Sequence, residues 1–121
     1  MSAGDVIYEY GFWLLPTSKN ATAAISKGDV VSLPDGRKCA TGDSGPFGVA
    51  ITDIASGENM QGKVLIKGTA KVVTSGAISQ FAYVAPDNNG KVKAAGATDS
   101  KVGVALEAAS ASGDIITIIL L

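Results

Sequence analysis

Short runs of β-branched and small apolar residues, each closed by turn-forming residues, make up most of the chain from Lys27 onward. Two of the turns, Asp35-Gly36 and Asn89-Gly90, lie between β-compatible segments, and such dipeptides are strong hairpin signals. The chain has 15 glycines but only three glutamates, so it is poor in the residues that build long helices. This pattern predicts a mainly β protein with short strands and tight turns.

The strand segments occur as two similar sets. Residues 47–51 (FGVAI) and 102–106 (VGVAL) match in character, and Val104 lies 55 positions after Val49. Each segment follows one of the two hairpins and precedes an Ala-Ser-Gly-acidic turn, at residues 55–58 and 111–114. The shared order indicates two related halves. Two units are too few for a solenoid, so we expect a barrel or sandwich with approximate internal symmetry.

Composition argues against catalysis and against several classes of partner. The chain contains no histidine and one cysteine, which removes the common nucleophilic triads and most zinc sites. The formal net charge is −1, and no run of lysines or arginines suits nucleic acid. No apolar stretch approaches the ~20 residues of a membrane span, and no signal-peptide pattern is present. We therefore expect no catalytic residues, metal, cofactor, small-molecule substrate, nucleic acid or membrane, and synthesis in the cytoplasm.

Two motifs resemble ligand sites without meeting their requirements. Residues 57–63 (GENMQGK) satisfy the start of a P-loop, but Val64 stands where the magnesium-binding Ser or Thr belongs. The residues after it favour a strand, whereas a P-loop opens a helix. Residues 87–90 (DNNG) are rich in oxygen ligands but lack the spacing of a calcium loop. We predict a strand connection and a tight turn at these places. Cys39 is expected to be a small buried apolar residue.

Four of the chain's aromatic residues fall within six positions near the N-terminus. Each would bury about 150–250 Å² when packed. Alternation in this segment would place several of them on one face of a strand, which suits addition to the sheet of a partner. Two alternatives remain open: these side chains either bind a partner or fold over the core of the chain itself. The candidate partner-binding residues are Val6, Ile7, Tyr8, Tyr10, Phe12, Trp13 and Leu14.

The last seven residues, 115–121 (IITIILL), are apolar on both faces of an expected strand. A strand of this kind has to be covered on both sides. One side faces the core of the chain, and we expect a neighbouring subunit to cover the other. The candidate residues for this subunit interface are Ile116, Ile118 and Leu120.

The order of several segments is similar to that of a known family. Residues 27–31 (KGDVV), 47–50 (FGVA), 68–72 (GTAKV) and 102–105 (VGVA) follow one another after an aromatic arm. In this respect the chain resembles small tailed-phage proteins regarded as capsid decoration, or cement, proteins. The resemblance implies homotrimers at local three-fold axes on the outer surface of the phage head, and an N-terminal segment that pairs with the major capsid protein. It also implies a fold like that of the lambda head decoration protein.

The expected fold is therefore mainly β: a single small β-barrel or β-tulip-like domain with an approximate internal repeat and an extended N-terminal arm. Residues 1–26 form the arm and residues 27–121 the β-rich decoration domain. The expected function is a structural virion protein that binds and stabilises an assembled phage head. The alternative is a small β-barrel binding module, such as a tail-adhesin or carbohydrate-binding domain.

Overall fold

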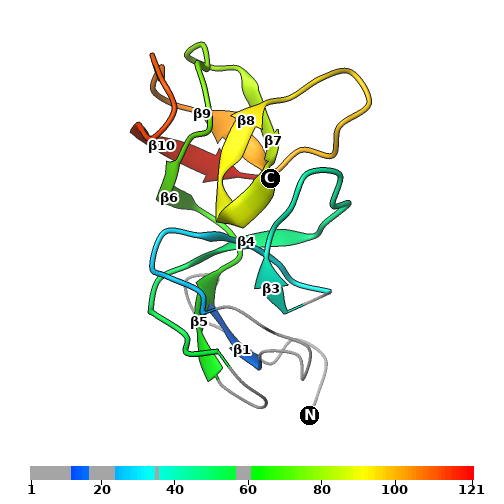
Figure 1. Ribbon diagram of the computed structural model, residues 1–121, viewed down its shortest axis with the longest axis vertical. Helices are drawn as coiled ribbons and strands as arrows, with labels where there is room; N and C mark the ends of the chain where they lie inside the picture. The colour runs from blue at the N-terminus through cyan, green and yellow to red at the C-terminus, as the bar shows by residue number, and fades with distance from the viewer. Residues whose placement is uncertain (1–11, 17–23, 35, 57–60) are drawn as a thin grey trace.

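The computed structural model describes residues 12–16, 24–34, 36–56 and 61–121, which form two five-stranded antiparallel sheets (Figure 1). The first sheet has the order β1 (Phe12–Pro16), β5 (Gln61–Leu65), β4 (Phe47–Ala50), β2 (Val30–Ser32) and β3 (Arg37–Lys38). The second has the order β6 (Thr69–Val73), β10 (Ile115–Leu120), β9 (Gly103–Ala105), β7 (Tyr83–Pro86) and β8 (Val92–Ala94). The mainly β class is confirmed.

The two sheets have the same topology, because β6 to β10 are ordered in the second sheet as β1 to β5 are in the first. The registers agree as well. Val49 pairs with Leu65 in the first half, and Val104 pairs with Ile119 in the second. Each half also closes with an isolated bridge, Ile25 with Ile54 and Ile78 with Ala109. The predicted internal repeat is confirmed, and it is a duplication of a whole five-stranded unit.

Both predicted hairpins form, one in each half. β2 pairs with β3, and β7 pairs with β8. The turn of the second hairpin includes a short 3₁₀ segment, η2 (Asn88–Gly90), in which Asn89 adopts a φ of 62°. The carboxylate of Asp87 accepts a hydrogen bond from the backbone N–H of Asn88 at 2.8 Å. Such Asx caps stabilise tight turns, and the predicted turn at residues 87–90 is confirmed.

The main core lies between the two sheets and draws on both halves. In the first half, Val30, Val49 and Leu65 belong to this core. The opposite face of the first sheet carries a second, smaller cluster of buried residues. Its members are Ile25, Val31, Ala50, Ile54 and Val64. The first sheet is therefore apolar on both faces.

The first unit of the repeat begins before residue 27. β1, which falls inside the predicted arm, pairs along its whole length with β5. Ile25 is buried in the smaller cluster and exchanges two backbone hydrogen bonds of 2.8 Å with Ile54. The reason is topological: β1 holds the place in the first sheet that β6 holds in the second. Residues 12–16 and 25 are thus integral to the domain.

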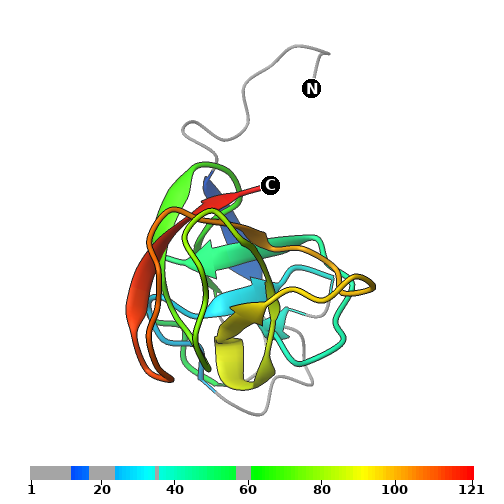
Figure 2. The same cartoon turned by 90° about the horizontal axis from the view of Figure 1, so that it is seen from above.

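The described strands form two separate sheets, and a single closed barrel is not among them. Gly68 lies between β5 and β6, where the chain passes from one sheet to the other, and its φ of 117° is a conformation that favours glycine. Seen from above, β10 lies along one side of the molecule (Figure 2). No helix in the described parts of the chain is long and apolar enough to cross a membrane.

Candidate binding surfaces

The described residues hold no cluster of three or more acidic, cysteine or histidine side chains that could bind a metal ion. The P-loop-like segment runs into strand β5, so Lys63 and Val64 lie in a sheet. A P-loop lysine instead opens a helix whose N-terminus faces the phosphates. Residues 57–60 of this segment lie outside the described residues. The prediction that a strand follows the motif is confirmed.

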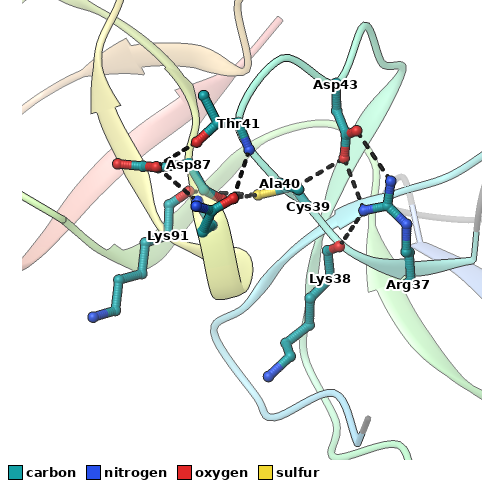
Figure 3. Close-up of polar contacts among 9 residues, drawn as sticks. Arg37, Lys38, Cys39, Ala40, Thr41, Asp43, Asp87 and Lys91 are labelled. Atoms are coloured by element: carbon teal, nitrogen blue, oxygen red, sulfur yellow. Dashed lines mark hydrogen bonds and ion pairs between the residues drawn. The ribbon is translucent and has the colours of Figure 1, made fainter. Parts of the chain in front are cut away.

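A network of hydrogen bonds joins the two halves at Asp87 (Figure 3). The hydroxyl of Thr41, from the first half, donates to the Asp87 carboxylate at 2.7 Å. The hydroxyl of Ser75 donates to its other carboxylate oxygen. The Thr41 backbone N–H also donates to the Asn88 side chain at 3.1 Å. The Ser75 and Thr41 hydrogen bonds lower the pKa of Asp87. These hydrogen bonds link the two halves and stabilise their relative orientation.

Cys39 lies beneath the same network. Its thiol is buried and donates to the backbone carbonyls of Asp87 and Lys91, with Sγ–O distances of 3.2 and 3.4 Å. Burial raises the pKa of the Cys39 thiol to about 12. A thiol with so high a pKa is a poor nucleophile, so Cys39 has a structural role, as expected.

An ion pair stabilises the loop that follows β3. Both terminal guanidinium nitrogens of Arg37, Nη1 and Nη2, donate to the carboxylate of Asp43, at 3.0 and 3.1 Å (Figure 3). The backbone N–H of Ala40 donates to the same carboxylate at 2.9 Å. Partial burial opposes ionisation of Asp43, but these contacts outweigh it and lower its pKa. The loop is thereby held against the hairpin.

An apolar cleft of about 570 Å³ opens between the two halves. Its walls include Val49 and Leu65 from the first half and Val72 and Ile115 from the second. The charged residues of its lining are two exposed lysines, Lys27 and Lys71. The lining contains no carboxylate, so it offers no acid–base pair for catalysis.

The two faces of β10 differ in exposure. Ile116, Ile118 and Leu120, the predicted subunit-interface candidates, are 2%, 0% and 6% exposed within a single chain, because they face the main core. Ile115 and Ile119, on the other face, are 63% and 41% exposed. The structure therefore corrects the choice of face: the side of β10 that is open to a neighbour carries Ile115 and Ile119.

Two exposed aromatic residues lie near this open face, and the sequence analysis did not select them. Phe81 is 66% exposed and Tyr83 is 50% exposed. The ammonium group of Lys101 lies 5.4 Å from the centre of the Tyr83 ring, within range of a cation–π contact. A sequence signal did exist: Tyr83 begins strand β7, whose next residues are small and apolar, but alternation alone does not say which face of the strand is outward.

The predicted arm residues divide into two groups. Val6, Ile7, Tyr8 and Tyr10 lie outside the described residues. Phe12, Trp13 and Leu14 form the first part of β1, opposite residues 63–65 of β5. β1 is an edge strand, and the side of β1 away from β5 has no strand partner among the described residues. Such an edge can accept a further strand from another chain.

The described part of the molecule is thus a duplicated β module with exposed apolar positions and an open sheet edge, a pattern typical of structural binding proteins. The family model for phage cement proteins matches residues 10–120. The chain belongs to the phage cement protein family. It is accordingly a structural, non-enzymatic protein of the virion that binds the capsid surface.

One solved structure with the same fold is the head fiber gp8.5 N base of bacteriophage phi29. The two chains are 14% identical, with a TM-score of 0.62 over 91% of this chain and 94% of that chain. At this identity the likeness concerns the fold. A search of curated proteins found no match.

Proposed function

We propose that this protein stabilises the assembled phage head by bridging neighbouring copies of the major capsid protein. The observation that carries the proposal is the family match over residues 10–120. A ligand that binds the assembled lattice, and not the free subunits, stabilises the lattice by mass action. Bridging requires two binding surfaces and no chemistry, which accords with a chain that has no histidine.

The N-terminal arm is the proposed contact with the capsid protein. β1 is the edge strand of the first sheet, and residues 1–11 precede it in the sequence. An extended segment that begins at an edge can continue by pairing with a strand of another protein, and alternate side chains then fill pockets on it. The residues proposed to make this contact are Val6, Ile7, Tyr8, Tyr10, Phe12, Trp13 and Leu14.

The protein is also proposed to act as a homotrimer. Three copies around a local three-fold axis of the head would each contact a different capsid subunit with an equivalent arm. Linked binding sites raise the overall affinity well above that of one site, provided that the geometry lets all of them engage. A trimer would therefore bind the head more tightly than a single copy does.

The alternative function, a carbohydrate-binding or tail-adhesin module, has one observation in its favour. Phe81 is an exposed aromatic ring, as sugar platforms require. The neighbouring Tyr83 ring is contacted by Lys101, so one of its faces is engaged. Glycan-array binding that depends on Phe81 would favour this alternative, and its absence together with capsid binding would exclude it.

The test uses phage heads that lack the protein. We expect such heads to release DNA at a lower temperature than wild-type heads, and purified protein to restore resistance when added back. A variant without residues 1–11, which keeps β1, should fold normally but bind heads at least tenfold more weakly. Full binding by this truncated protein would overturn the role of the arm, and unchanged heat release from undecorated heads would overturn the stabilising role.

A further inference from the structure

The internal duplication makes it possible to compare the two sheets position by position. In the first sheet, Val30, Val49 and Leu65 form a row across three neighbouring strands. In the second sheet, the corresponding row is Tyr83, Val104 and Ile119. Adjacent residues in such a row point to the same side of a sheet. The two rows therefore mark the same face of the duplicated unit.

The solvent exposure of this face differs between the two halves. Val30, Val49 and Leu65 are at most 7% exposed, because the face they mark is part of the core shared with the second half. Tyr83 and Ile119 are 50% and 41% exposed, and Val104 is partly exposed. The second half thus shows an apolar face for which the described part of the chain provides no cover, although its counterpart is covered by the chain itself.

Further side chains extend this face. Ile115 and Thr117 lie on the same side of β10 as Ile119, since side chains alternate along a strand. Phe81 lies two residues before Tyr83 and next to β9, where its N–H donates to the carbonyl of Ala105, and it is also exposed. We use the term outer face for the residues Phe81, Tyr83, Val104, Ile115, Thr117 and Ile119.

The charges near the outer face are of both signs. Lys71 pairs with Glu107 at 3.8 Å, and Lys71 also donates to the Thr117 hydroxyl at 3.3 Å. Lys101 lies over the Tyr83 ring. Charges of mixed sign produce no strong electrostatic potential of one sign, so this face does not attract a partner of strong net charge. The outer face is better matched by a surface that also carries few charges of mixed sign. A second copy of this chain, which has a net charge of −1, offers such a surface.

We propose that the outer face of the second sheet is an interface with a second copy of this chain. The inference deepens the homotrimer of the proposed function and rests on it. The reason is the duplication: the corresponding face in the first half is already shown to be covered by this same polypeptide. In a closed ring, each copy offers its outer face to the next, so all these faces are covered by one repeated contact.

The size of the face fits an interface within a ring. A packed aromatic side chain buries about 150–250 Å², so Phe81 and Tyr83 at their exposures leave roughly 100 Å² each. With the two exposed isoleucines, the apolar area is on the order of the largest patch found on monomeric proteins, about 300–600 Å². Stable interfaces bury about 800 Å² per partner. The outer face therefore supplies the apolar centre of an interface and needs a polar rim around it.

The test is the mass of the purified full-length protein in solution, by light scattering coupled to size-exclusion chromatography over a range of concentrations. We expect wild type to have the mass of several 12.1 kDa chains. Ile119→Lys should weaken association at least tenfold, since it places a charge at the centre of the face. Tyr83→Thr, which keeps a residue that favours β-strands at this position, should also weaken association. Ser112→Lys adds the same charge at an exposed turn position and should leave the mass unchanged.

Each variant is also checked for thermal unfolding and for cosedimentation with undecorated heads. Variants that are monomeric, with a single cooperative unfolding transition, support the proposal. A wild-type protein that is monomeric at every concentration overturns the proposal. It is also overturned if the Ile119→Lys and Tyr83→Thr variants both keep the wild-type mass. If both variants keep that mass but lose head binding, the outer face belongs to the capsid protein. That result would overturn the inference while leaving the decoration function intact.

Discussion

Phe81 occupies the position in the second half that Gly28 occupies in the first, and both adopt a left-handed backbone, with φ of 67° and 95°. The same hydrogen bond holds each of them: the N–H of Gly28 donates to Ala50 at 2.8 Å, and the N–H of Phe81 donates to Ala105 at 2.7 Å. A left-handed conformation costs a bulky residue about 1–2 kcal/mol. The second half thus carries an exposed aromatic residue where backbone geometry favours glycine, which points to a role outside the folding of the monomer.

Replacing Phe81 with glycine should therefore leave the monomer nearly as stable as wild type. Relief of the left-handed strain offsets the greater flexibility of glycine in the unfolded chain, about 0.5–1 kcal/mol. We expect the free energy of unfolding in urea, measured at low protein concentration, to change by less than about 1 kcal/mol. Tyr83→Gly is the control, because Tyr83 lies in strand β7 and should lose more. A large loss in Phe81→Gly would show that Phe81 supports the fold of the monomer.

Gly103 should be intolerant of any side chain. A Cβ at this position would lie 2.1 Å from the backbone oxygen of Ile119, on the paired strand β10. Because backbone cannot move aside cheaply, we expect Gly103→Ala to destabilise the protein by roughly 1–3 kcal/mol or more. Gly76→Ala is the control, since nothing lies within 4 Å of its added Cβ. Urea unfolding measures both, and equal stabilities would contradict the close strand approach.

Cys39 should resist alkylation in the folded protein. Burial raises the pKa of its thiol from 9.0 to about 12, so almost no thiolate exists at pH 8. We expect no labelling by iodoacetamide at pH 8 under native conditions and complete labelling in denaturant. Mass spectrometry counts the labelled chains, and the chain has no other cysteine. Rapid stoichiometric labelling of the native protein would mean that the junction between the halves opens readily.

Asp87 should stabilise the protein at neutral pH and lose this effect in acid. Its folded pKa is lowered, chiefly by the Ser75 and Thr41 hydrogen bonds, below the unfolded value of about 3.9. Stability from a lowered pKa is fully present above the unfolded value and is lost as the pH falls through the folded one. We expect Asp87→Asn to unfold at a lower temperature than wild type at pH 7.

The difference in unfolding temperature between wild type and Asp87→Asn should shrink as the pH falls below about 4. Ser75→Ala serves as the matched variant, because it removes one donor to the same carboxylate. Its effect should be smaller in the Asp87→Asn background than in wild type. A difference that stays constant from pH 7 to pH 2 would show that Asp87 acts through packing and not through its charge.

The sequence predicted the local structure well, because turns and β-branched runs act over a few residues. The two predicted hairpins are present as the pairs β2–β3 and β7–β8, although Asp35 lies outside the described residues, and the repeated Gly-Val-Ala segments lie in corresponding strands. The absence of histidine and the Val64 in the P-loop-like segment pointed away from catalysis, and the family match agrees.

The tertiary structure decided matters that depend on residues far apart in the chain. β1 belongs to the first repeat because it pairs with β5, about fifty residues later, and no local pattern in residues 12–16 contains that partner. The orientation of β10 is a second case. Residues 115–120 are apolar on both sides of the strand except for Thr117, so the alternation of side chains does not indicate which side faces the core. Only packing against the first half buries Ile116 and Ile118 and leaves Ile115 and Ile119 exposed.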